Sequence, residues 1–197
     1  MTYLSATWAW RIHGPHFLLQ ARPQVCSAAV VDFLSRCASP TPFAIRSFVP
    51  GDAPALAAVY RDTVRGQGPR AYDTAQVEAW AAYPEDLEEF RDRLAQGLTL
   101  VADGPEGPAA FGQLHPEHHI ALLYCATRWS GQGLGSRIYR RLEARARARG
   151  VARLDTDASR LSRPFFERHG FHVVAVDHPV RHGVVFERFR MEKRLDA

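Results

Sequence analysis

The sequence has little sulfur and no long apolar run: its 197 residues include only three cysteines and two methionines. Cys26, Cys37 and Cys125 are odd in number and lack metal-type spacing, so we expect reduced thiols in a cytoplasmic protein without a bound metal. A membrane-spanning helix needs about 20 consecutive apolar residues, and none are present, which argues against a membrane partner. The start of the chain also lacks the basic and apolar regions of a signal peptide.

No charge of one sign dominates the chain. Lysine and arginine number 25 against 21 aspartates and glutamates, for a net charge of +4. Much of the positive charge lies in one short segment, at Arg137, Arg140, Arg141, Arg145, Arg147 and Arg149. Such a cluster can attract nucleic acid or a phosphorylated small molecule. Without a zinc-finger, helix-turn-helix or RNA-recognition motif, a solvated helix face is the simpler interpretation, and nucleic acid is not an expected partner.

The first part of the chain differs from the rest. Residues 1–42 show no sustained hydrophobic period and end in the proline-rich "ASPTP". We therefore predict an N-terminal extension of unknown role over 1–42 and one domain over 43–197. The hydrophobic content of 46% is that of an ordinary globular protein, and the length suits a single α/β core.

Short apolar or alternating runs predict the strands. The run "HIALLYC" at 119–125 is almost entirely apolar, which is typical of a central strand. The two runs that flank "GPEGP" predict a hairpin. We expect strands over residues 43–48, 98–103, 109–114, 119–125, 151–158, 171–176 and 184–193.

Caps and stop signals delimit the predicted helices. Asp52 is the expected N-cap of the first helix and Ser162 that of the last, which Gly170 ends. Pro84 is expected to begin one helix that Gly97 ends. Between them these signals predict helices over 53–66, two pieces within 72–97, one over 134–149 and one within 159–170.

A glycine-rich stretch, "RWSGQGLGS" at 128–136, joins the central strand to the arginine-rich helix. Backbone N–H groups and the helix dipole at such a junction favour an anion, while glycine permits close approach and positive φ angles. A simple turn explains the glycines equally well when they are taken alone. A P-loop would need Gly-Lys-Ser/Thr, and a Rossmann fingerprint would need glycine where Ser136 stands, so both nucleotide motifs are excluded.

Three segments together resemble the GNAT superfamily of acyl-CoA-dependent N-acetyltransferases, and within it a bacterial subgroup. They are "YCATRWSGQGLGSRIYRRLEARARARG", "ASRLSRPFFERHGF" and "FAIRSFVPGDAPALAAVYRD", and the similarity covers residues 43–193. It implies an α/β fold with a mixed, mostly antiparallel central sheet that is flanked by helices and splayed at its central parallel strand pair. It also implies a homodimer as one assembly, although the sequence leaves the oligomeric state open.

The resemblance implies direct transfer of an acetyl group from acetyl-CoA to a primary amine of a small molecule or peptide. A longer acyl donor and a non-catalytic acyl-CoA sensor are the alternatives. The co-substrate would be bound by the strand end, the glycine loop and a serine where relatives carry asparagine. These residues are Leu123, Cys125, Ser130, Gly131, Gln132, Gly133, Gly135, Ser136 and Ser159.

Two positions depart from the family pattern. Ser130 stands where the loop motif has arginine or glutamine, and Arg128 is close enough to supply charge. Phe166 stands where many members have the tyrosine that acts as general acid. Tyr124 is a candidate replacement, although packing in the sheet would equally explain an aromatic residue there.

The expected general base lies at the start of the central strand, where His119 and the neighbouring Glu117 are candidates. A structural histidine is the alternative for His119. Strand alternation predicts that His119, Ala121, Leu123 and Cys125 share one face, and that Ile120, Leu122 and Tyr124 share the other. We expect the Cys125 thiol to be buried rather than nucleophilic.

The acceptor site should lie among the early helices and the last strands. Tyr72 and Trp80 are placed to flank a small amine, and helix packing is the alternative role for both. Nothing in the sequence identifies the amine.

Overall fold

A seven-stranded sheet organises the computed structural model, which describes residues 43–195; the predicted extension over 1–42 lies outside the described residues. Its order is β1-β2-β3-β4-β5-β9-β6. Every pairing is antiparallel except that of β4 with β5, so the predicted mixed sheet is confirmed. The strands are β1 (Ala44–Ser47), β2 (Leu98–Gly104), β3 (Gly107–Leu114), β4 (His119–Cys125), β5 (Arg153–Ala158), β6 (His172–Asp177) and β9 (Arg188–Arg194).

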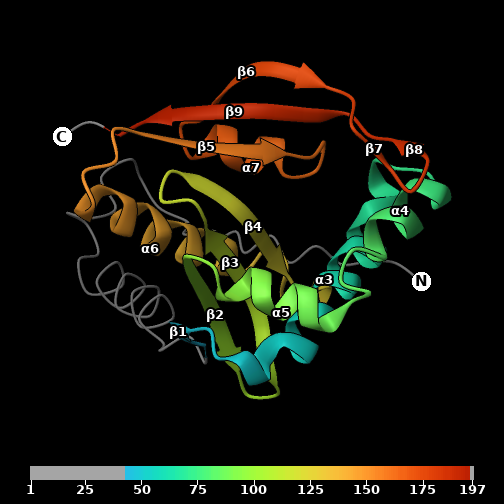
Figure 1. Cartoon of the computed structure of the whole chain (residues 1–197), viewed down its shortest axis with the longest axis horizontal. Helices are drawn as coiled ribbons and strands as arrows, with labels where there is room; N and C mark the ends of the chain where they lie inside the picture. Colours follow the sequence, from blue (N-terminus) through green and yellow to red (C-terminus); the bar gives the residue numbers. More distant parts are fainter. Residues whose placement is uncertain (1–42, 196–197) are drawn as a thin grey trace, which may run out of the picture. The chain divides into compact units, whose positions relative to one another are not determined.

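The sheet divides at the β4–β5 boundary. Within the described residues, β4 pairs with β5 only at His119–Asp155 and Ile120–Thr156. Beyond these two pairs the strands diverge, and β5, β9 and β6 run across β4 as a separate group (Figure 1). The predicted splay of the central parallel pair is confirmed.

Helices cover both faces of the sheet and form two hydrophobic cores. On one face lie α6 (Leu134–Ala148) and α7 (Arg163–Arg168); on the other lie α3 (Ala53–Gln67), α4 (Thr74–Ala81) and α5 (Leu87–Ala95). The predicted apolar stripe of α6 is buried, since Leu134, Ile138 and Leu142 are at most 1% exposed. The amphipathic period therefore directs α6 onto the sheet.

Both predicted N-cap residues occupy the N-cap position, Asp52 before α3 and Ser162 before α7, but neither side chain caps its helix. A 3₁₀ turn, η1 (Pro50–Asp52), precedes α3, and the Asp52 carboxylate accepts hydrogen bonds from Arg46 and the Val49 N–H instead of capping α3. The Ser162 hydroxyl accepts from the Ser159 N–H rather than from α7. In both cases a nearby polar partner competes for the capping oxygen.

The predicted start of α5 is wrong. The helix begins at Leu87, not at Pro84, because the Asp86 carboxylate accepts hydrogen bonds from the N–H groups of Glu88 and Glu89. Its predicted end is confirmed, since Gly97 follows the helix with a φ of +67°.

The last predicted strand is interrupted. Residues 184–193 do not form one strand, because β8 (Val184–Val185) folds back on β7 (Val180–Arg181) in a separate hairpin. The turn between them places His182 and Gly183 at φ angles of 47° and 75°, as a tight hairpin requires. The Gln76 side chain donates to the Val185 carbonyl (2.8 Å) and fixes the hairpin to α4.

The predicted alternation along β4 is broken by a β-bulge. Leu114 pairs with Ile120, but the preceding Gln113 pairs with Leu122, so Ala121 is an extra residue. Consequently His119 and Ala121 do not share a face with Leu123 and Cys125. Instead, the α6 core receives Ile120, Leu123 and Cys125, and the α3 core receives Ala121, Leu122 and Tyr124.

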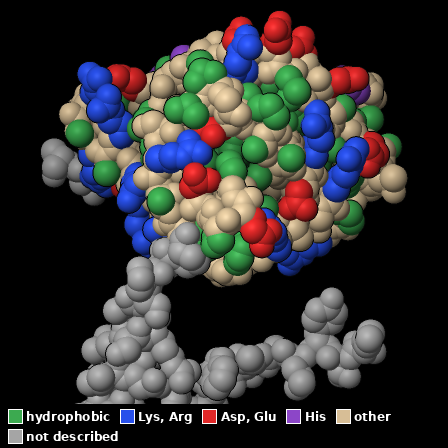
Figure 2. Space-filling model, turned by 90° about the horizontal axis from the view of Figure 1, so that it is seen from below, with side chains coloured by type: hydrophobic (Ala, Val, Ile, Leu, Met, Phe, Trp, Pro, Cys, Tyr) green, Lys and Arg blue, Asp and Glu red, His purple; other side chains and the backbone are tan. Residues whose placement is uncertain are grey.

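Several arginines of α6 contact groups of the chain itself. Arg137 and Arg141 donate to the carbonyls of Phe43 and Ile45 (3.1 and 2.8 Å), and Arg147 pairs with Glu143. Figure 2 shows Lys and Arg side chains interspersed with Asp and Glu side chains over the face that it presents. In residues 43–195, no helix has the length and apolar character needed to cross a membrane.

One ion pair joins α6 to the far part of the sheet. The Lys193 ammonium on β9 donates to both Glu143 oxygens (2.9 and 3.0 Å), and the two side chains are only 18% and 13% exposed. Burial acts to raise the pKa of Glu143, but hydrogen bonds from Tyr139, Lys193 and Arg147 outweigh it and lower the pKa to about 2.

We predict that Glu143→Gln lowers the free energy of unfolding at pH 7 by about 2 kcal/mol, because Lys193 loses its buried counter-charge. The Glu143 pKa is lower in the folded than in the unfolded state. Its contribution is therefore complete above the ordinary value of 4.5 and is lost as pH falls toward about 2. Urea unfolding at several pH values measures both effects.

The matched control is Glu167→Gln, which breaks the exposed Arg163–Glu167 pair of α7, each side chain 43% exposed. We expect a change below about 0.5 kcal/mol there. Equal losses in the two variants would contradict a special role for the α6–β9 ion pair.

Candidate active site

The splay opens two cavities that meet where β4 leaves β5. One, which we call the loop cleft, has a volume of about 680 Å³ and lies between the glycine-rich stretch, β4 and α7. The other, which we call the aromatic pocket, has a volume of about 540 Å³ and lies between α4, β4 and the β7–β8 hairpin. Both are lined by Trp80, Ala121, Leu122, Tyr124, Asp157 and Ser159.

The glycine-rich stretch presents backbone donors to the loop cleft. Gly131 and Gly133 have φ angles of +78° and +81°, and a Cβ at either would meet nothing within 4 Å, so glycine is needed for conformation rather than space. The first backbone hydrogen bond of α6 is the one that the Arg137 N–H donates to the Gly133 carbonyl (3.0 Å). The N–H groups of Leu134, Gly135 and Ser136 therefore precede the helical ladder and can bind an anion in the cleft.

Three polar side chains of this stretch, those of Arg128, Gln132 and Ser136, contact other groups of the protein. Gln132 does not line the loop cleft, and its amide donates to the Arg128 carbonyl (3.3 Å). The Ser136 hydroxyl lies 3.0 Å from Nε2 of His169. Arg128 pairs with Glu106, so it does not take the place of the family's loop arginine in the cleft. The stretch therefore offers a ligand its backbone together with Ser130, which lines the cleft.

The end of β4 also directs backbone groups into the gap. The Ala126 N–H donates to Ala109 on β3 (2.8 Å), and hydrogen-bonding directions alternate along an antiparallel ladder. Leu123 and Cys125, which pair with Gly112 and Ala110, therefore direct their N–H and C=O groups toward the diverging β5. The Cys125 carbonyl is within hydrogen-bonding distance of the Thr63 hydroxyl (2.9 Å).

Tyr124 stands between the two cavities. Its hydroxyl accepts a hydrogen bond from the Trp80 indole (3.3 Å), and its ring lies 4.3 Å from that of Tyr60. Burial raises the pKa of Tyr124, and hydrogen bonds from Tyr60 and Trp80 oppose this. The phenol is therefore protonated at neutral pH. Phe166 lines the loop cleft but brings no proton donor.

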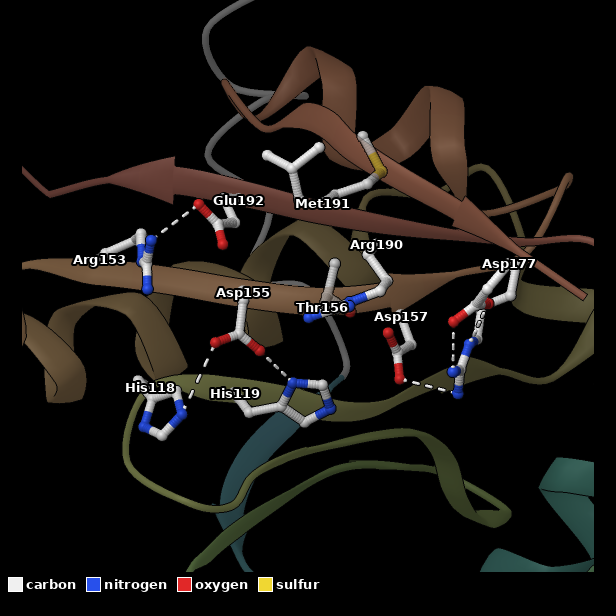
Figure 3. A pocket seen from close by; sticks show the side chains of 12 residues that line it. His118, His119, Arg153, Asp155, Thr156, Asp157, Asp177, Arg190, Met191 and Glu192 are labelled. Carbon is white, nitrogen blue, oxygen red and sulfur yellow. Dashed lines mark hydrogen bonds and ion pairs between the residues drawn. The ribbon is translucent and has the colours of Figure 1, made fainter. Parts of the chain in front are cut away.

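His119 is held by a carboxylate that sequence reasoning missed. Its Nδ1 contacts Asp155 of β5, whose other oxygen lies 3.7 Å from His118 Nε2, as Figure 3 shows. His119 is 24% exposed and lines the aromatic pocket together with Tyr124. Glu117 does not join them, because its side chain is 66% exposed and lies 3.6 Å from Arg149.

Tyr72 and Trp80 both line the aromatic pocket, with ring centroids 5.4 Å apart. The Tyr72 hydroxyl accepts from the Arg160 N–H (2.9 Å) and so fixes the loop that follows β5. In that loop the Ser159 and Ser162 hydroxyls lie 3.0 Å apart, which orients Ser159 at the edge of both cavities. Both aromatic residues thus pack the helices and line the pocket at once.

Comparison with known proteins identifies the family. Residues 69–195 match the family model described as an acetyltransferase (GNAT) domain. The chain is 29% identical over 147 residues to the uncharacterized N-acetyltransferase YafP of Escherichia coli. The matched region covers 75% of this chain and 93% of that protein. A GCN5-related N-acetyltransferase from Rhodopseudomonas palustris superposes with a TM-score of 0.76 at 32% identity, over 79% and 96% of the two chains.

A more distant structure shares the fold. The PaiA N-acetyltransferase of Thermoplasma acidophilum, solved in complex with coenzyme A, has a TM-score of 0.65 at 18% identity. The similarity covers 78% of this chain and 99% of that one. The arrangement of sheet and helices is thus that of the family.

The environment of Cys125 predicts that its thiol is alkylated slowly. Burial, with a smaller contribution from Asp62, raises the pKa of the Cys125 thiol to about 11. In a Cys26→Ser, Cys37→Ser variant, we expect Cys125 to react with iodoacetamide at pH 8 about 100-fold more slowly than N-acetylcysteine, because its thiolate fraction is lower. The predicted burial of Cys125 is only partial, since the residue is half-buried and lines the loop cleft. The rate should rise with pH toward about 11, and rapid alkylation at pH 8 would contradict the raised pKa.

Proposed function

The chain belongs to the GNAT acetyltransferase family, and from this premise we propose that its acceptor is a primary amine of a small molecule or peptide. The protein is an acetyl-CoA-dependent N-acetyltransferase. One observation carries the proposal: His119 and Tyr124, a base and an acid, line one pocket that meets the loop cleft at the splay.

The loop cleft suits coenzyme A, which brings phosphates, a long polar arm and an acetyl group activated as a thioester. In the proposal, backbone N–H groups between Gly131 and Ser136 hold the pyrophosphate. Backbone groups of Leu123 and Cys125 bind the arm, because the β5 side of β4 leaves them facing the gap. Ser159 contributes from the opposite wall.

His119 is the proposed general base. An ionised Asp155 can only accept a hydrogen bond, so the Nδ1 that contacts it carries the proton. The lone pair is then on Nε2, the atom available to take a proton from an amine in the aromatic pocket. Asp155 acts as a positioning residue that fixes the ring and its tautomer.

Tyr124 is the proposed general acid. Its oxygen already accepts the Trp80 hydrogen bond, so its own proton is available to donate. In the transfer, the thioester C–S bond breaks and an amide C–N bond forms. An acceptor in its ammonium form loses one proton to His119 before the attack, and the nitrogen loses a second when the amide forms. The departing sulfur gains one proton from Tyr124, which the second proton from nitrogen replaces, so no oxidant or reductant is required.

We predict that Tyr124→Phe lowers kcat by about 100-fold while the affinity for acetyl-CoA stays within about twofold, because only the donated proton is lost. Thiol release across an amine panel measures kcat, and calorimetry measures binding. Unchanged turnover would remove Tyr124 from the mechanism. Acetyl-CoA binding without thiol release on any amine would contradict amine acetylation itself and favour a sensor.

For the base, we predict that His119→Gln lowers kcat/KM by about 100-fold and Asp155→Asn by about 10-fold. The defect of His119→Gln should shrink as pH rises, because more of the acceptor amine is then already deprotonated. His172→Gln, at an exposed position of β6, is the matched control and should leave kcat/KM unchanged. A defect that is independent of pH would indicate a structural role for His119.

A further inference from the structure

The aromatic pocket has a chemical character beyond what acetyl transfer requires. Four phenol or indole rings and one phenyl ring, those of Tyr60, Tyr72, Trp80, Tyr83 and Phe186, surround its interior. Such a lining packs against a planar or bulky apolar body. The volume of about 540 Å³ is that of a small-molecule site.

The β7–β8 hairpin forms the outer wall of this pocket. Arg181 and His182 at its tip line the cavity, and Phe186 at its base packs 6.0 Å from the Tyr72 ring. The Gln76 bond to Val185 anchors the hairpin to α4, and the Phe186 N–H bond to the Pro179 carbonyl (2.9 Å) closes the base of the hairpin. The β7–β8 hairpin therefore holds Arg181 at the wall of the pocket.

The charges of the lining do not balance. Its two carboxylates are neutralised by arginines, since Glu187 pairs with Arg160 (2.9 Å) and Asp157 with Arg188 (3.1 Å). By contrast, Arg181 and Arg93, which both line the pocket, form no ion pair within residues 43–195. Arg93 lies over the Tyr83 ring, 5.8 Å from its centroid.

The positive charge of Arg181 reaches the interior. It acts to lower the pKa of Tyr60, Tyr83 and Tyr124, against the larger effect of burial in each case. Arg181 is exposed and lines the same pocket as these phenols, which lie on different elements, so its charge lies beside the cavity. A cationic group at the mouth of an apolar site binds an anion more strongly than the same group in water.

We propose that the acceptor is a small amine that carries a carboxylate on an aromatic or bulky apolar body. Its carboxylate binds Arg181, assisted by Arg93, while its body lies among the pocket rings and its amine reaches His119. Guanidinium and carboxylate match as planar, two-pronged partners. This inference rests on the proposed function and assigns the substrate class for the same site.

The test compares amines that differ only in the carboxylate, such as phenylalanine with phenethylamine and tryptophan with tryptamine. Rates are expressed per neutral amine, because the carboxylate changes the amine pKa. With the intact chain we expect kcat/KM to be about 10-fold higher for the carboxylate member of each pair. Arg181→Gln should lower kcat/KM for the carboxylate members by about 10-fold and so remove most of this preference.

Charge reversal and a distant control sharpen the result. Arg181→Glu should reverse the preference, and Arg145→Gln, at an exposed position of α6, should leave it unchanged. Equal rates for both members of each pair, or a preference that survives Arg181→Gln and Arg93→Gln together, would overturn the inference. Thiol release on none of the amines, with acetyl-CoA still bound, would instead overturn the proposed function.

Discussion

The divergence of β4 from β5 after two paired residues is the constraint on which the rest of the site depends. A parallel ladder that stops inside a sheet leaves backbone N–H and C=O groups without strand partners, and burying them unpaired is costly. Side chains satisfy two of the carbonyls: the Thr63 hydroxyl donates a hydrogen bond to the Cys125 carbonyl, and the Thr156 hydroxyl donates one to the Ile120 carbonyl (both 2.9 Å). The remaining groups face a cleft, where a polar ligand can satisfy them.

The bulge at Ala121 makes this opening useful for chemistry. With unbroken alternation, His119 and Tyr124 would point to opposite faces of the sheet. The extra residue shifts the phase, so both line the aromatic pocket, while Leu123 and Cys125 pack toward α6. Asp155 is then opposite His119 because the last paired residues of β4 and β5 lie beside the point of divergence. Splay and bulge together place a base and an acid beside the cleft.

Much of the fold was predictable because periodicity and glycine positions report directly on backbone conformation. The α6 stripe, the β2–β3 hairpin and the positive φ angles of Gly131 and Gly133 follow from such local rules. The β4 bulge does not, since nothing in "HIALLYC" distinguishes an extra residue from regular alternation. Asp155 was missed for a related reason: its partner depends on the register between strands more than 30 residues apart. A search for carboxylates opposite His119 in the predicted parallel pair could have found it.

The two halves of the site differ in how sequence encodes them. The groups proposed to bind the donor in the loop cleft are mainly backbone N–H and C=O groups, so a short glycine pattern can predict them. The aromatic pocket is built from side chains of α3, α4, β4 and the β7–β8 hairpin, which come together only in the folded chain. Its uncompensated arginines line this pocket and not the loop cleft, so they can vary without changing the donor site, whereas Trp80 and Tyr124 line both cavities. For this reason the donor can be inferred from the family, whereas the acceptor must be inferred from the charges and rings of this chain.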